Sequence, residues 1–141
     1  VVVEFEGKLV IPATPSNNAI ITASSSNEDS PIKNVNDGNL KNKWQALKGE
    51  KSAILEVDLG KPVSVQCLSV AEPWHPWDHV QQKIKLQFQD GLNWKTIITF
   101  KSQGTGLTQG FTPVTAQKFR LTIQNETKAP GLNELFLFRA E

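Results

Sequence analysis

Alternation of apolar and polar side chains with a period of two is the dominant pattern of this 141-residue chain. The alternation is clearest in residues 53–59, and six more segments follow it: 19–23, 65–70, 84–89, 94–100, 119–124 and 135–138. Successive side chains of a β-strand point to opposite faces, so this pattern is typical of antiparallel strands with one buried face. No segment has the period of an amphipathic helix longer than a turn or two. The sequence therefore predicts an all-β fold.

Turn-forming residues separate the predicted strands. Glycine marks four breaks, at residues 60–62, 90–93, 104–106 and 130–131. Among these, Asp90-Gly-Leu-Asn93 joins two alternating segments and is the clearest hairpin signal. About eight short strands separated in this way predict an antiparallel β-sandwich of the jelly-roll kind.

The length and composition of the chain fit one domain. Hydrophobic residues make up 38% of the sequence, and 141 residues can bury one ordinary core without disulfides. We place this domain at residues 19–141, where the strand pattern runs. Residues 1–18 contain Pro12 and Pro15 and are interpreted as an N-terminal extension or linker with a candidate edge strand. Because the chain begins without Met and has no signal-peptide pattern, we expect it to be a mature or excised piece of a longer protein.

The charge balance excludes two classes of partner. Fifteen Lys and Arg residues against 14 Asp and Glu residues give a net charge of +1. A nucleic-acid-binding domain would carry a basic stripe, and an anionic membrane would require a polybasic cluster. We therefore expect neither nucleic acid nor membrane as a partner. The single cysteine, Cys67, lies in an alternating segment and is predicted to be a buried apolar side chain rather than a reactive thiol.

A polar stretch at residues 24–43 lacks strand periodicity and is too long for a simple connection. Around Gly38 it gathers side chains that carry oxygen atoms: Asn34, Asn36, Asp37, Asn39 and Asn42. Calcium takes six to eight oxygen ligands, and a glycine permits the chain to wrap tightly around the ion. The spacing is not that of an EF-hand. An Asn-rich turn that stabilises itself without metal is the alternative, and these residues alone leave both open.

Residues 72–79 form an unusual connection between two predicted strands. They combine five residues suited to binding within a proline-stiffened segment: Trp74, His75, Trp77, Asp78 and His79. Indole faces stack on the apolar face of a sugar ring, while histidine and aspartate bind its hydroxyl groups. A metal on the two histidines is a weaker interpretation, because no third ligand lies nearby. The other alternative is that both indoles are buried, inside the sandwich or at an interface with a neighbouring domain.

Motifs of catalysis are missing from the sequence. It contains no Gly-x-Ser-x-Gly elbow, no glycine-rich phosphate loop and no His-Glu-x-x-His pair. The carboxylates show no spacing that pairs two of them across a cleft for glycoside hydrolysis. We therefore predict that the chain is not itself an enzyme.

Residues 19–141 resemble the coagulation factor 5/8 type C (discoidin) β-sandwich, a galactose-binding-like jelly roll. The resemblance is carried, in chain order, by residues 23–25, by 36–39 with Trp44, and by 53–60, 91–95, 116–123 and 132–138. More narrowly, residues 68–72 leading to Val80, residues 113–117 and the C-terminal segment are similar to the C-terminal β-sandwich module of family 29 α-L-fucosidases.

This resemblance implies a structural calcium ion in the loop at residues 34–42, which we call the Asn-rich loop. In carbohydrate-binding members the Asp-Gly-Asn loop holds calcium, and a glutamate near the C-terminus closes the site. Carried over, Asp37 and Glu134 would supply carboxylates, while Asn34, Asn39 and Asn42 would offer mainly backbone carbonyls. Many members have Thr where Asn42 stands.

The resemblance also implies a sugar site on the loops at one end of the sandwich. Residues 74–79 form what we call the Trp-rich segment. The resemblance adds two sugar-binding candidates to it: Asn125, just past the strand at 119–124, and Arg120, within that strand. Modules attached to fucosidases often pack on the catalytic barrel instead, in which case Trp74 and Trp77 would be interface residues.

The function implied is that of a non-catalytic carbohydrate-binding accessory module of a glycoside hydrolase, with an α-L-fucosidase as parent. Its partners would be a glycan or monosaccharide and the catalytic domain of the parent enzyme. We expect a secreted or periplasmic location as part of a larger exported enzyme. The alternative is a structural docking domain that packs on the catalytic barrel without binding sugar. A lipid-binding discoidin domain fits less well, because such domains usually join their termini by a disulfide and this chain has one cysteine.

Overall fold

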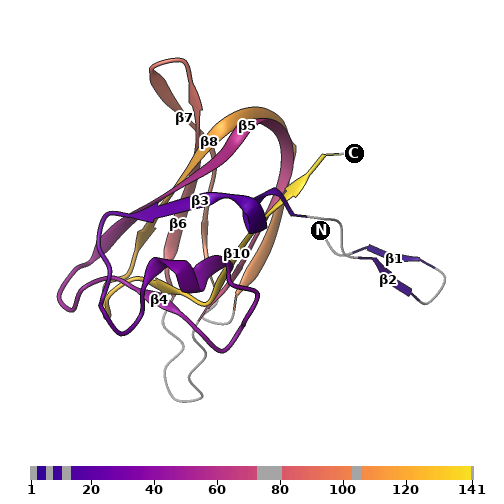
Figure 1. Cartoon of the computed structure of the whole chain (residues 1–141). Helices are drawn as coiled ribbons and strands as arrows, with labels where there is room; N and C mark the ends of the chain where they lie inside the picture. Colours follow the sequence, from indigo (N-terminus) through magenta and orange to yellow (C-terminus); the bar gives the residue numbers. More distant parts are fainter. Residues whose placement is uncertain (1–2, 6–7, 11–13, 73–80, 103–105, 141) are drawn as a thin grey trace.

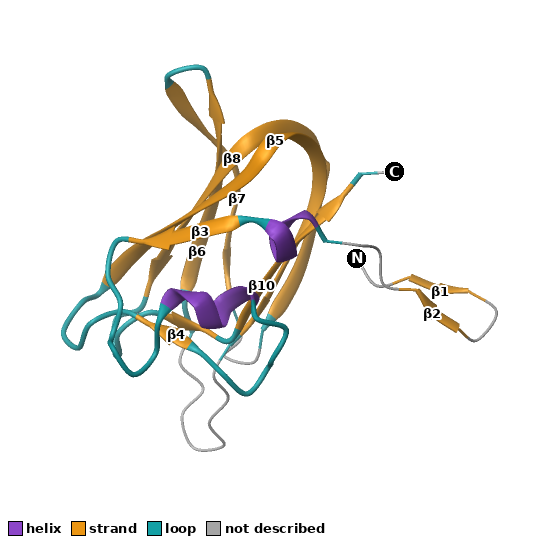
Figure 2. Cartoon of the chain, in the orientation of Figure 1, coloured by secondary structure: helices purple, strands orange, loops and turns teal. Residues whose placement is uncertain are grey.

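The computed structural model describes residues 3–5, 8–10, 14–72, 81–102 and 106–140. The described elements are, in order, β1 (Val3–Phe5), β2 (Lys8–Val10), the 3₁₀ helix η1 (Pro15–Asn18), β3 (Ile20–Ala23), the 3₁₀ helix η2 (Ile32–Asn36), β4 (Trp44–Gln45), β5 (Ser52–Ala71), β6 (Lys83–Asp90), β7 (Asn93–Lys101), β8 (Leu107–Gln124), β9 (Gly131–Leu132) and β10 (Glu134–Arg139). Figure 2 shows that the two helices are short coils and that strands form most of the body. Neither helix in the described residues has the length to cross a lipid bilayer.

Two long strands, β5 and β8, build the sandwich. They pair antiparallel along most of their length and arch over together at one end of the molecule (Figure 1). Residues 52–58 of β5 pair with 118–124 of β8, and this half of the pair continues through β6 and β7 on one side and β3 on the other. Residues 65–71 of β5 pair with β10 in the other half. The eight strands β3–β10 confirm the predicted antiparallel β-sandwich.

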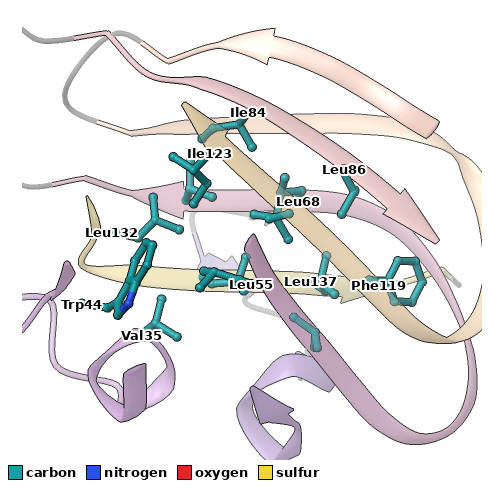
Figure 3. Close-up of a cluster of buried hydrophobic side chains, with 14 of the residues drawn as sticks. Val35, Trp44, Leu55, Leu68, Ile84, Leu86, Phe119, Ile123, Leu132 and Leu137 are labelled. Carbon is teal, nitrogen blue, oxygen red and sulfur yellow. The ribbon is translucent and has the colours of Figure 1, made fainter. Parts of the chain in front are cut away.

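The apolar face of each strand meets the others in one core (Figure 3). The alternation of the sequence appears as alternating burial, since Leu55 and Val57 of β5 are fully buried while Ile54 and Glu56 between them are not. The residues labelled in Figure 3 show how several elements contribute: Val35, Trp44, Leu55, Leu68, Ile84, Leu86, Phe119, Ile123, Leu132 and Leu137. Cys67 is fully buried with a free thiol, as predicted.

The strand boundaries differ from the prediction at two places. Residues 60–62 were expected to form a turn, but they form a bend within the continuous strand β5, where the Asp58 Oδ1 atom accepts a hydrogen bond of 2.8 Å from the Gly60 N–H. The first half of β8 carries no clear alternation and was not predicted. Proline has no N–H to donate to a strand ladder, and Pro113 lies at an irregularity in the β5–β8 pairing, between the pairs Val65–Val114 and Cys67–Gly110.

The N-terminal residues make two kinds of contact. Strands β1 and β2 pair only with each other among the described strands. Helix η1 instead packs on the sandwich, because the fully buried Ser16 hydroxyl donates to the Leu135 carbonyl oxygen (3.3 Å) and accepts from the Leu137 N–H (3.0 Å). The domain boundary at residue 19 stays a prediction. The contact that Ser16 makes with β10 lies N-terminal to that boundary.

Candidate functional site

Asp37 and Glu134 meet although 96 positions separate Gly38 from Glu134. Helix η2 ends at Asn36 with Asp37 as its C-cap, and strand β10 begins at Glu134 and packs beside that helix. Gly38, whose φ of +77° favours glycine, donates its N–H to the Glu134 Oε1 atom over 3.1 Å. The fold thus makes neighbours of the two carboxylates that the family resemblance implied.

Glu134 is an unusual carboxylate because none of its surface is exposed. Its Oε2 atom is buried and accepts no hydrogen bond among the described residues. The pKa of Glu134 is raised to about 7, mainly by burial and in smaller part by the neighbouring Asp37 carboxyl. A buried oxygen without a partner beside a second carboxylate is an arrangement that a cation would stabilise.

Asp37 is held by the loop itself. The Asn42 side-chain amide donates to the Asp37 Oδ2 atom over 2.8 Å, and the Asn39 N–H donates to Oδ1 over 2.8 Å. The first of these bonds is the main reason why the pKa of Asp37 lies below its usual value. Asp37 is therefore already ionised at pH values below about 7, where Glu134 is still mostly protonated, and the pair gains its second negative charge as the pH rises through about 7.

The other predicted ligands use their side chains locally. The Asn34 side-chain amide donates to the Lys43 carbonyl oxygen (2.9 Å), and the Asn39 Oδ1 atom accepts from the Lys41 N–H (2.9 Å). The Asn39 carbonyl oxygen also accepts from the Asn42 N–H over 3.2 Å, and a carbonyl oxygen has a second lone pair that can be offered to a cation. No three His, Cys, Asp or Glu side chains gather to hold a metal within the described ranges, so carbonyl oxygens would have to complete any coordination shell here. The two carboxylates with these carbonyls fit a hard, oxygen-binding cation.

Asn133 is a neighbour of this site that the sequence did not indicate. Its side-chain amide donates to the Leu40 carbonyl oxygen over 2.7 Å, while its Oδ1 atom is buried without a partner in the described part of the chain. It ties the strand that carries Glu134 to the far end of the Asn-rich loop.

A buried polar network lies at the two ends of the Trp-rich segment. Glu72 precedes that segment, Gln82 follows it, and the Gln82 side-chain amide donates to the Glu72 Oε2 atom over 2.7 Å. The Ser102 hydroxyl donates to the same oxygen over 2.6 Å. Gln82 also donates to the Gly131 carbonyl oxygen (2.8 Å) and accepts from the Gly131 N–H (3.0 Å). The network therefore joins β5, β6, β7 and β9 at one end of the sandwich.

Asn125 belongs to the same network. It is only 5% exposed, and its side-chain amide donates to the Gln82 Oε1 atom over 3.3 Å. Its Oδ1 atom accepts from the backbone N–H groups of Thr127 and Lys128 and from the Thr127 hydroxyl. Contact between Asn125 and a sugar stays a prediction, but both polar atoms of this side chain already have protein partners.

The remaining predicted sugar-binding residues are not brought together in the described structure. Five of them, Trp74, His75, Trp77, Asp78 and His79, lie outside the described residues. Arg120 lies within β8, where its guanidinium stacks 3.9 Å from the ring centre of Trp94 and contacts the Glu56 Oε1 atom at 3.3 Å. Five extended residues span roughly 16 Å, so Arg120 is well separated from Asn125 along the strand.

A cavity of about 470 Å³ lies beside Asn125 and was not predicted from the sequence. It is lined by Asn27, Gln45 and Ala46, by residues 48–51 and by residues 127–129. These segments are far apart in the chain and carry no shared motif. The volume lies within the range of about 300–1,000 Å³ that is typical of small-molecule sites.

Comparison with known proteins gives a family and a set of similar folds. The F5/8 type C domain model matches residues 20–135. No curated protein matches the chain in sequence.

Several solved structures share the fold at low sequence identity. The structure of SpGH29 is 19% identical with a TM-score of 0.78, and the aligned region covers 92% of this chain and 28% of that one. A Ruminococcus gnavus GH29 fucosidase in complex with fucose is 19% identical with a TM-score of 0.76, covering 92% of this chain and 27% of the other. The family 32 carbohydrate-binding module of Clostridium perfringens NanJ, in complex with galactose, is 19% identical with a TM-score of 0.78. The aligned region covers 89% of this chain and 97% of the NanJ module. This chain thus spans about a quarter of the two GH29 chains and nearly the whole of the NanJ module.

Proposed function

Because the chain belongs to the F5/8 type C domain family, we propose that it is a non-catalytic carbohydrate-binding accessory module of a glycoside hydrolase, with an α-L-fucosidase as parent. The similar folds include a module bound to galactose and a region of GH29 enzymes. The observation that carries the proposal is the construction of one end of the sandwich. There the buried side chains of Glu72, Gln82 and Asn125 form a fixed base next to a cavity and at both ends of the Trp-rich segment.

The proposed action is to hold the parent enzyme near its glycan. A single site that uses ring stacking and a few hydrogen bonds binds weakly, since those hydrogen bonds largely replace bonds to water. When such a site is tethered to a catalytic domain, it still raises the effective concentration of substrate at that domain. In this proposal Trp74 and Trp77 supply the stacking faces, and His75, Asp78 and His79 bind hydroxyl groups.

Calcium is proposed as a structural ligand of the module. Asp37 and Glu134 would hold it, with backbone carbonyls of Asn34, Asn39 and Asn42 completing the shell. When bound, the ion supplies positive charge to the buried carboxylate of Glu134. The protein side of the site then links the Asn-rich loop to β10 and keeps that loop in one conformation.

A docking domain without sugar binding is the second candidate function. Large apolar side chains are exposed on the module, among them Ile20 (71%) and Leu47 (51%). The coverage of only about a quarter of the GH29 chains also indicates that such a fold accompanies a larger catalytic part in those proteins. In this case Trp74 and Trp77 would contact the catalytic barrel.

Titration of the isolated chain with fucose and with galactose, followed by NMR, separates the two functions. The four tryptophans give four indole N–H signals. Sugar binding is expected to shift the signals of Trp74 and Trp77, while that of Trp94, stacked under Arg120, stays in place as an internal control. Absence of shifts at Trp74 and Trp77 at saturating sugar would reject stacking on these indoles, and absence of any resonance shift would reject sugar binding and leave the docking function.

A further inference from the structure

The cavity beside Asn125 has walls that hydrogen bonds fix in place. The Asn27 N–H donates to the Gln45 carbonyl oxygen over 2.8 Å, and the Gln45 side-chain amide donates to the Ala129 carbonyl oxygen over 3.3 Å. The Ala46 N–H donates to the Pro130 carbonyl oxygen over 2.9 Å. Three segments of the chain are thereby tied to one another around the cavity.

The two rims of the cavity are also linked. The Asn125 N–H donates to the Lys51 carbonyl oxygen over 2.9 Å, and the Lys51 ammonium donates to the Glu126 carbonyl oxygen over 2.7 Å. The second bond holds the Lys51 side chain across the gap between the turn at 46–51 and the turn at 125–128. An ammonium group has three N–H donors, so this bond leaves Lys51 with further donors for a ligand.

Positive charge is concentrated at this cavity. Its lining contains Lys48, Lys51 and Lys128 but only one carboxylate, that of Glu50. Three positive charges against one negative charge leave an excess of two, whereas the whole chain has a net charge of only +1. A ligand with negative charge is therefore favoured there over a neutral one, and a cationic amino sugar is disfavoured.

The rest of the lining suits a ring with polar and apolar faces. Ala46 and Ala129 offer methyl groups, while Asn27, Gln45 and Thr127 belong to polar residue types that bind hydroxyl groups. From the charge, volume and chemistry of this cavity we propose that it is a subsite for an acidic sugar residue, one that carries a carboxylate or a sulfate. This inference rests on the proposed carbohydrate-binding function and names the class of glycan that the module prefers.

Galacturonic acid and galactose form the matched pair of probes, because they differ only in the carboxylate at C6. Backbone amide shifts of the isolated chain, followed by NMR during titration with each sugar, should report binding at residues 46–51 and 127–129. We expect galacturonic acid to bind about fivefold more tightly at low salt, as one or two exposed ion pairs allow. Added sodium chloride should reduce this preference, because salt screens exposed charges.

Substitutions at Lys48 test whether the acidic sugar binds in this cavity. Lys48→Gln should remove most of the preference for galacturonic acid, and Lys48→Arg should retain it. Lys61→Gln is the matched control, since Lys61 lies in the bend of β5, about nine extended residues or roughly 30 Å from residue 52. Urea denaturation of each variant confirms that it is folded.

The outcomes separate this inference from the function on which it rests. Equal affinity for the two sugars, or a preference that Lys48→Gln leaves intact, overturns the acidic subsite and leaves carbohydrate binding in place. Failure of both sugars to shift any resonance overturns carbohydrate binding itself, and the acidic subsite with it.

Discussion

Glu134 is the residue on which the proposed calcium site depends most. Replacing it by Gln removes a buried carboxylate that has an unpartnered oxygen. We therefore expect Glu134→Gln to be as stable as the parent chain or more stable in excess chelator. The parent should gain roughly 2–3 kcal/mol from calcium at about 100 times the dissociation constant, and the variant should gain almost nothing.

Thermal denaturation in calcium chloride and in chelator measures this difference. Glu56→Gln is the matched control, because Glu56 lies on β5 and pairs with Arg120 away from the loop, so its gain from calcium should match that of the parent. An equal gain in Glu134→Gln would contradict the assignment of Glu134 as a ligand.

The raised pKa of Glu134 predicts an unusual pH dependence of the metal-free chain. The Glu134 carboxyl has its ordinary pKa of 4.5 in the unfolded state and a pKa of about 7 in the folded state. Between these values the folded state binds more protons than the unfolded state, so stability falls as the pH rises from about 4.5 to about 7. The loss is on the order of 3 kcal/mol and persists above that range.

Urea denaturation across this pH range in chelator measures whether the free energy of unfolding falls as the pH rises. The slope should be smaller in Glu134→Gln and in the parent with calcium, since neither retains the bare carboxylate. A parent whose stability in chelator is flat or rises over this range would disagree with the burial of Glu134.

At the scale of the elements, Gln82 is the residue that holds the ends of several strands together. Its side chain bonds to Glu72, Gly131 and Asn125 inside the sandwich. Gln82→Ala would leave these buried groups without partners, so we expect it to lower the free energy of unfolding by about 3 kcal/mol or more. Gln87→Ala is the control, because the Gln87 amide donates to the Thr96 hydroxyl at the surface, and this variant should lose less than about 0.5 kcal/mol.

Urea denaturation of both variants measures this contrast. Losses of similar size at the two glutamines would show that the network stabilises the fold no more than one surface hydrogen bond does.

At the scale of the whole molecule, the arch of β5 and β8 makes the two layers one cooperative unit. Each strand contributes to both layers, so neither layer can unfold while the other keeps its pairing. We expect a single two-state transition, with coincident midpoints by tryptophan fluorescence and far-ultraviolet circular dichroism. Leu55→Ala in one layer and Leu68→Ala in the other should each lower stability by about 2–5 kcal/mol and shift both probes together. Midpoints that separate in either variant would indicate layers that unfold independently.

Local features of this chain could be predicted because they depend only on neighbouring residues. The period of two determined which face of each strand is buried, as Leu55 and Val57 show. The hairpin at Asp90–Asn93 was predicted and is confirmed by the pairing of these two residues. Cys67 was assigned to the interior for the same reason of alternation.

The sequence by itself thus determined the strand class, the buried faces and, through resemblance to a family, the two carboxylates that meet at the Asn-rich loop. Only the tertiary structure decided that β5 continues through residues 60–62, that Asn125 is buried against Gln82, and that Lys48 and Lys51 line a cavity with residues 127–129. Alternation says which side of a strand faces inward, but not which distant strand lies opposite or at which register. Those choices come from packing between residues far apart in the chain, and the cavity exists only once they have been made.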